Sequence, residues 1–264
     1  MTRPFSRAGT LGGGAPAPVT SPVTSPVTAV TPPVTGTTAA AGAPTGLQAV
    51  LLDMDGTLVD TEGFWWDTEV EVFAELGYEL ADEHREVVVG GPMSRSGAHL
   101  IRVTGADISL AELTVLLNAR FVERIARGVS LMPGARRLLT ELDAHGVPAA
   151  LVSASHRRVI DRMLVWLGPE HFALTVAGDE VERTKPHPDP YLLAAGRLGA
   201  DPARCVVVED TPTGVASAEA AGCPVVAVPS VTRIEPAGGR TVVPSLEEVD
   251  LSVLRSLVPS ADRV

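Results

Sequence analysis

Two aspartates separated by one residue end a short apolar run in Val50-Leu51-Leu52-Asp53-Met54-Asp55-Gly56-Thr57. Carboxylates in such a pair can divide nucleophilic and acid–base work between them. An apolar run of this length, bounded by a glycine, is typical of a strand buried on both faces. Ligands of open α/β sheets bind beyond the carboxyl ends of the strands. We therefore interpret Asp53 and Asp55 as the catalytic edge of an enzyme.

Polar side chains follow an apolar run, or stand in a Pro-rich loop, in three later segments. The segments are Leu151-Val152-Ser153-Ala154-Ser155, Lys185-Pro186-His187-Pro188-Asp189-Pro190 and Val207-Val208-Glu209-Asp210. In a parallel sheet, strand ends of one polarity share an edge, so these groups should converge on the two aspartates. Four polar clusters at one edge would form a site.

The only lysine of the chain is Lys185, whereas the other 20 of the 21 basic residues are arginines. A sequence that uses arginine almost everywhere has no compositional reason to place its single lysine at any particular position. A compact ammonium suits a crowded anionic site better than a planar guanidinium does.

Composition excludes several classes of partner. The net charge of -11 and a pI near 5.0 offer no basic field for nucleic acid or an anionic membrane. The sequence has no apolar run long enough to span a membrane and no secretory signal, so we expect a cytoplasmic protein. Cys205 and Cys223 adjoin apolar runs. This favours two buried free thiols over a bridge.

Residue patterns divide the chain into three parts. Residues 1–46 are rich in Pro, Thr, Ser and Ala, which predicts a disordered tail. Residues 63–129 have helical periodicity and contain Ser109-Leu-Ala-Glu112, a capping-box pattern, so we expect an all-helical cap inserted after the first strand. Residues 47–62 and 130–264 then form the catalytic core.

Helical and strand patterns alternate from Pro133 onward, which predicts a doubly wound, Rossmann-like α/β fold with a parallel sheet. The expected strands are 148–153, 174–177, 205–208, 225–228 and 241–243, and the expected helices are 133–145, 156–167, 189–198, 213–221 and 247–257.

Together, these motifs resemble those of the haloacid dehalogenase superfamily, in the branch of β-phosphoglucomutase and small sugar-phosphate phosphatases. The resemblance runs from about Leu47 to the C-terminus, with all four motifs in order. It implies a Mg²⁺-dependent phosphatase acting on a small phosphorylated metabolite through an aspartyl-phosphate. Asp53 would be the nucleophile. Asp55 would be the general acid and later the base.

The resemblance also implies the remaining site residues. Mg²⁺ would be held by Asp53, the backbone carbonyl of Asp55, Asp210 and Glu209, with Glu209 either a ligand or a support. Alternatively, the acidic pair caps the following helix. Ser153, the N–H groups of Ala154 and Gly56, and Lys185 would bind the phosphate. By itself, a serine after a strand is more often a helix cap.

Residues of the predicted cap distinguish a phosphatase from a phosphomutase. The stretch from Gly90 to Ser96 resembles a substrate-facing loop, which makes Arg95 a candidate for substrate contact or else a solvated residue at a helix start. Trp65 either closes over the substrate or packs in the cap, and Trp66 should pack. Trp65 stands where the mutases carry a cap histidine, and their cap lysine is absent. Both departures favour a phosphatase over the alternative, a phosphomutase.

Two other classes fit less well. A dehalogenase has no use for Asp55 or the metal carboxylates. A non-catalytic binding protein would have lost at least one of four motif residues, and all four are present: Asp53, Asp55, Lys185 and Asp210. From the resemblance we expect a monomer.

Overall fold

The computed structural model describes residues 46–88 and 93–259. The predicted tail, apart from Gly46, and positions 90–92 of the predicted substrate-facing loop lie outside the described residues. Within these ranges, no helix is long and apolar enough to cross a membrane.

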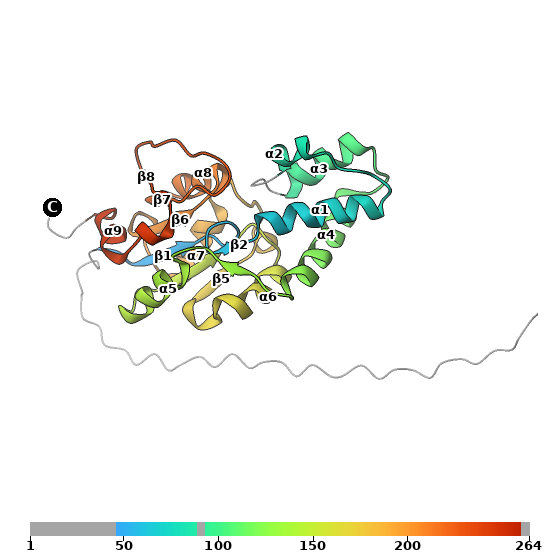
Figure 1. The fold of residues 1–264 in the computed structure, drawn as a ribbon. Coiled ribbons are helices and arrows are strands. Elements are labelled where there is room, and N and C mark those ends of the chain that lie inside the picture. Colours follow the sequence, from blue (N-terminus) through green and yellow to red (C-terminus); the bar gives the residue numbers. More distant parts are fainter. Residues whose placement is uncertain (1–45, 89–92, 260–264) are drawn as a thin grey trace, which may run out of the picture. The chain divides into compact units, whose positions relative to one another are not determined.

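A six-stranded parallel sheet forms the centre of the fold (Figure 1). In spatial order its strands are β5 (Leu174–Val176), β4 (Ala149–Val152), β1 (Ala49–Leu52), β6 (Cys205–Glu209), β7 (Val225–Ala227) and β8 (Arg240–Val242). The strand that carries the aspartate pair, β1, is therefore internal, paired with β4 on one side and β6 on the other. This arrangement confirms the predicted doubly wound α/β fold.

Helices cover both faces of the sheet. Side chains of β1 alternate between two hydrophobic clusters: Val50 and Leu52 belong to one, and Ala49 and Leu51 to the other. The first cluster includes residues of α5 (Ala135–Ala144), α6 (Arg157–Leu167) and α9 (Leu251–Ser256), and the second includes residues of α7 (Asp189–Leu198) and α8 (Pro212–Ala220). Burial of both faces explains why β1 is a continuous apolar run and does not alternate with polar residues.

The four described helices between β1 and α5 have a hydrophobic cluster of their own. They are α1 (Glu62–Glu75), α2 (Arg85–Val88), α3 (Met93–Thr104) and α4 (Leu110–Ile125). Trp66, Phe73, Leu100 and Leu113 are buried together in this cluster, as helical spacing predicted for α1 and α4. Ser109 and Glu112 form the predicted capping box at the start of α4.

Two features differ from the sequence-based expectation. A short antiparallel pair, β2 (Val59–Asp60) and β3 (Ser130–Leu131), flanks the helical stretch. Two-residue strands carry no detectable periodicity. The helix expected over 247–257 is also interrupted, because Asp250 is extended and its carboxylate accepts a hydrogen bond from the N–H of Val253 at 2.8 Å. The chain forms a 3₁₀ turn (Leu246–Glu248) and then α9.

Further 3₁₀ turns are short connectors: Asp82–His84, Pro169–His171, Gly178–Glu180 and Pro202–Arg204. Cys205 and Cys223 are both buried free thiols, which confirms the expectation for the cysteines.

Candidate active site

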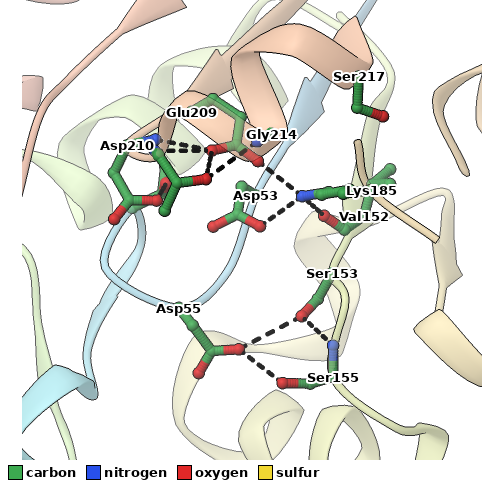
Figure 2. A network of polar contacts seen from close by, with 12 residues as sticks. Asp53, Asp55, Val152, Ser153, Ser155, Lys185, Glu209, Asp210, Gly214 and Ser217 are labelled. Atoms are coloured by element: carbon green, nitrogen blue, oxygen red, sulfur yellow. Dashed lines mark hydrogen bonds and ion pairs between the residues drawn. The ribbon is translucent and has the colours of Figure 1, made fainter. Parts of the chain in front are cut away.

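The carboxyl ends of three neighbouring strands bring the predicted polar residues together (Figure 2). Asp53 follows β1, Ser153 follows β4, and Glu209 is the last residue of β6. The register pairs Leu52 with both Leu151 and Val208, so the three strand ends are level. The parallel topology thus produces the convergence inferred from the sequence.

A tight turn follows Asp53, as the need to separate the two carboxylates predicted. Gly56 has a φ of +82°, which favours glycine, and its N–H donates to the carbonyl of Val59 at 2.9 Å. A Cβ at Gly56 would lie 2.2 Å from Oδ2 of Asp210. Gly56 therefore permits both the turn and the approach of Asp210. Its N–H, predicted to bind phosphate, is engaged within the turn.

Lys185 is buried and makes three hydrogen bonds through its ammonium. Nζ donates to Oδ1 of Asp53 at 2.6 Å, to Oε1 of Glu209 at 2.8 Å and to the carbonyl of Val152 at 2.9 Å. Burial alone would lower the pKa of Lys185, but the carboxylates of Asp53 and Glu209 outweigh it and raise that pKa well above its usual value. The single lysine therefore stays charged beside Asp53.

Glu209 is a heavily used acceptor. Oε1 accepts from Lys185 and from the hydroxyl of Tyr191 at 3.0 Å. Oε2 accepts from the N–H of Asp210 at 2.9 Å, from the N–H of Thr211 at 3.0 Å and from its hydroxyl at 3.1 Å. Because both oxygens have several donors, Glu209 is suited to hold Lys185 against the start of α8. Sequence reasoning missed Tyr191, whose position in α7 resembles that of any core aromatic.

Lys185 pairs with the carboxylates of Asp53 and Glu209, and a third buried carboxylate, that of Asp210, lies close to these two. Oxygen atoms of Asp53, Glu209 and Asp210 lie within 4.8 Å of one another. Burial is the largest cause that raises the pKa of Asp53, to about 7 despite Lys185, and it raises that of Asp210 well above the usual range with the charge of Asp53 adding to it. This buried excess of negative charge, on hard oxygen donors, fits a divalent cation such as Mg²⁺.

Asp55 accepts hydrogen bonds from a different set of residues. Oδ1 accepts from the hydroxyl of Thr61 at 2.8 Å and from Nε1 of Trp65 at 3.4 Å. Oδ2 accepts from the hydroxyls of Ser155 at 2.8 Å and Ser153 at 3.3 Å. The structure thus separates the environments of the two aspartates. Figure 2 shows Asp53 bonded to Lys185, whereas Asp55 is bonded to Ser153 and Ser155.

Trp65 both lines the cavity and packs against a cap helix, while closure over a substrate stays a prediction. It lines the cavity beside Asp55, and its ring stacks on Phe121 of α4 with 3.7 Å between ring centroids. Sequence reasoning did not select Thr61 or Ser155. Their signals were present, since Thr61 directly precedes α1 and Ser155 stands two residues after Ser153.

A cavity of about 150 Å³ lies over the site and is lined by both the sheet edge and the helical cap. Its volume is below the roughly 300 Å³ at which pockets for drug-sized ligands begin, which suits a small ligand. Ser153, Ala154 and Lys185 line it together with Asp53, Asp55, Glu209 and Asp210. Arg95 is not among its lining residues. It is exposed and donates to the carbonyl of Val87 at 3.5 Å.

Known proteins are similar to this chain over most of its length. The family model of haloacid dehalogenase-like hydrolases matches residues 50–228. Hexitol phosphatase A of Escherichia coli (strain K12) is 37% identical over 218 residues, which are 78% of this chain and 90% of that protein. A bifunctional riboflavin kinase/FMN phosphatase of Arabidopsis thaliana is 34% identical over 186 residues, 70% of this chain. The match spans only 49% of the Arabidopsis protein.

A solved structure is also similar over most of the chain. The crystal structure of CbbY from Rhodobacter sphaeroides in complex with phosphate has a TM-score of 0.71 and 29% sequence identity. The match covers 79% of this chain and 99% of the CbbY chain. On the family match, the relatives and the shared fold, the chain belongs to the haloacid dehalogenase-like hydrolase family.

Proposed function

We propose that this phosphoric monoester hydrolase is a Mg²⁺-dependent phosphatase, which hydrolyses a small phosphomonoester through an aspartyl-phosphate on Asp53. The observation that carries the proposal is the separation of the two aspartates. Asp53 is bound to a buried ammonium at 2.6 Å, and Asp55 accepts four hydrogen bonds from neutral donors.

Lys185 prepares the carboxylate of Asp53 for attack on phosphate. The ammonium holds Oδ1, which fixes the orientation of the carboxylate and reduces its repulsion of an incoming phosphate. Ser153 and Ala154 line the same cavity. The hydroxyl of Ser153 and the N–H of Ala154 would bind the phosphoryl oxygens together with Lys185. Attack by Asp53 on phosphorus then transfers the phosphoryl group to the carboxylate.

Asp55 acts as the general acid and then as the general base. In the first step it protonates the oxygen of the leaving group, and in the second it removes a proton from the water that attacks the aspartyl-phosphate. Its hydrogen bonds to Thr61, Ser153, Ser155 and Trp65 hold the carboxylate in one orientation for both steps.

Asp53, Asp210 and the backbone carbonyl of Asp55 would hold the Mg²⁺. Glu209 would support Asp210, because its Oε2 accepts a hydrogen bond from the backbone N–H of Asp210. When bound, the cation neutralises the buried negative charge and that of the phosphate. Thr57 and Ser230 donate to the two oxygens of Asp210 and fix its side chain.

A phosphomutase is the alternative. A mutase needs the aspartyl-phosphate to be attacked by a second hydroxyl of the sugar in place of water, so that the phosphoryl group passes from Asp53 to the sugar. In this chain Trp65 stands near Asp55 and donates its indole N–H to it at 3.4 Å. An indole cannot exchange a proton as an imidazole does, which supports water as the acceptor.

Assays of purified protein against sugar phosphates, glycerol phosphate and phosphoglycolate, with Mg²⁺ or with chelator, test the proposal. We expect phosphate release that requires Mg²⁺ and is abolished in Asp53→Asn. Activity that survives chelation or this substitution would contradict the mechanism. Conversion of β-glucose 1-phosphate to glucose 6-phosphate without phosphate release would favour the mutase.

A further inference from the structure

Glu69 of α1 is a buried carboxyl that the proposed mechanism does not use. Only 3% of the residue is exposed, and it lines the cavity above Asp53 and Asp55. Among the described residues, its Oε2 has no hydrogen-bond partner. Since a buried polar atom without a partner costs about 1–3 kcal/mol, its retention against the cavity calls for a ligand.

The chemistry of Glu69 restricts what that ligand can be. Burial raises the pKa of the Glu69 carboxyl to about 8, and no described side chain offsets this effect. The group therefore carries its proton at neutral pH. A protonated carboxyl can donate one hydrogen bond and accept others, which matches a hydroxyl group.

Other cap residues around the cavity have the same character. Ser96 of α3 and Asn118 of α4 are buried polar residues that line the cavity. Together with Glu69 they present hydroxyl, amide and carboxyl groups from three cap helices. None of the described cap residues in the lining carries a positive charge. An anionic leaving group would therefore find no counter-ion on this side of the cavity.

We propose that Glu69 is a specificity-determining residue, whose carboxyl hydrogen-bonds a hydroxyl on the leaving group of a polyol or sugar phosphate. The inference rests on the proposed function and narrows it. Phosphate binds at the sheet edge, and the cap selects an uncharged, hydroxylated leaving group in preference to an apolar or a charged one.

A pair of esters that differ only in hydroxyl groups tests this directly. Glycerol 3-phosphate and propyl phosphate share the phosphate and the carbon chain, so the ratio of their kcat/KM values measures recognition of the hydroxyls. In the wild-type protein we expect glycerol 3-phosphate to be preferred. Glu69→Leu should reduce the preference about 10- to 100-fold, as loss of a hydrogen bond to a buried group predicts. Glu69→Gln should retain most of it.

Glu71→Leu is the matched control, since Glu71 is an exposed glutamate of the same helix, paired with Arg124. It should leave the ratio unchanged. Glu69→Ala serves as a second truncation in case the leucine variant does not fold, as judged by circular dichroism. An unchanged ratio in a folded Glu69→Leu or Glu69→Ala protein would overturn the inference.

The same assays distinguish recognition of a hydroxyl group from two other outcomes. Wild-type preference for ethanolamine phosphate that disappears in Glu69→Leu would mean that Glu69 binds an amine, which also overturns the inference. Propyl phosphate lacks the hydroxyls, so its Mg²⁺-dependent hydrolysis reports on the phosphatase chemistry alone. If neither these three esters nor the sugar phosphates and phosphoglycolate release phosphate with Mg²⁺, the proposed function itself fails and this inference fails with it.

Discussion

Lys185 determines the charge balance of the site at the scale of single residues. It is 4% exposed and offsets part of the charge of the buried carboxylates beside it. Each of its three contacts is at 2.9 Å or less, so the ammonium is held in a fixed position. Sequence reasoning identified this residue because it is the only lysine. The structure adds that Glu209 and Val152 hold it in place.

Lys185→Met should therefore destabilise the protein and abolish its activity. Removing one partner of a buried ion pair typically costs about 3–5 kcal/mol, because it leaves an uncompensated buried charge. Urea unfolding and phosphate release are the measurements. Lys185→Arg keeps the charge but not the geometry, and it should retain more stability than activity. Wild-type stability in Lys185→Met would contradict the assignment.

Glu69 should make the stability of the protein depend on pH. Its carboxyl has a pKa raised from 4.5 to about 8 on folding, so between these values the folded state holds a proton that the unfolded state has lost. The contribution of Glu69 to the free energy of unfolding is thus most favourable below about pH 4.5. It declines as pH rises toward 8, by up to about 1.4 kcal/mol per pH unit.

Glu69→Gln removes this titration. The difference in the free energy of unfolding between Glu69→Gln and wild type should grow in favour of the variant from pH 5 to pH 8. Urea denaturation at several pH values measures it, with exposed Glu71→Gln as the control that should show no such trend. Parallel stability curves for wild type and Glu69→Gln would show that Glu69 is not protonated in the folded protein.

The start of α8 is the element that fixes the acidic side of the site. Glu209 accepts from the first N–H groups after β6, and Gly214 in the first turn of α8 leaves room for its carboxylate. A Cβ at Gly214 would lie 1.6 Å from Oε1 of Glu209, the oxygen that accepts from Lys185. Strand, helix and lysine are therefore coupled through one carboxylate.

Gly214→Ala should displace Glu209 and, with it, Lys185. We expect a loss of activity of at least about 100-fold, together with destabilisation of about 1–3 kcal/mol from overpacking. Gly196→Ala in α7 is the matched control, since no atom lies within 4 Å of its added Cβ. Because alanine favours a helix over glycine by about 1 kcal/mol, Gly196→Ala should be neutral or stabilising. Thermal unfolding and phosphate release distinguish the two, and equal effects would contradict the coupling.

Secondary elements differ in how well the sequence predicts them. The core strands and α7 were predicted almost to the residue, because both faces of the sheet are buried and the elements are bounded by Pro, Gly or polar residues. The break at Asp250 was missed because its capping hydrogen bond is local and leaves the apolar spacing intact. The pair β2–β3 was missed because each strand has only two residues.

At the scale of the whole molecule, the described part has hydrophobic clusters on the two faces of the sheet and a third in the helical cap. The parallel topology makes the convergence of strand ends predictable, and so the positions of Asp53, Ser153, Lys185 and Asp210. Partners from the cap follow from how separate helices pack, which no spacing encodes. That is why Glu69 emerged only from the structure, and why Arg95 does not line the cavity.

Trapping the phosphoryl group on Asp53 tests the central claim most directly. Asp55→Asn should block the second step, because it removes the base that activates water. 4-Nitrophenyl phosphate has a leaving group that needs little protonation, so the first step should still proceed. After mixing with Mg²⁺ and acid quenching, mass spectrometry should find one phosphoryl group on the peptide that contains Asp53. Absence of the adduct, or an adduct that persists in Asp53→Asn/Asp55→Asn, would contradict the account.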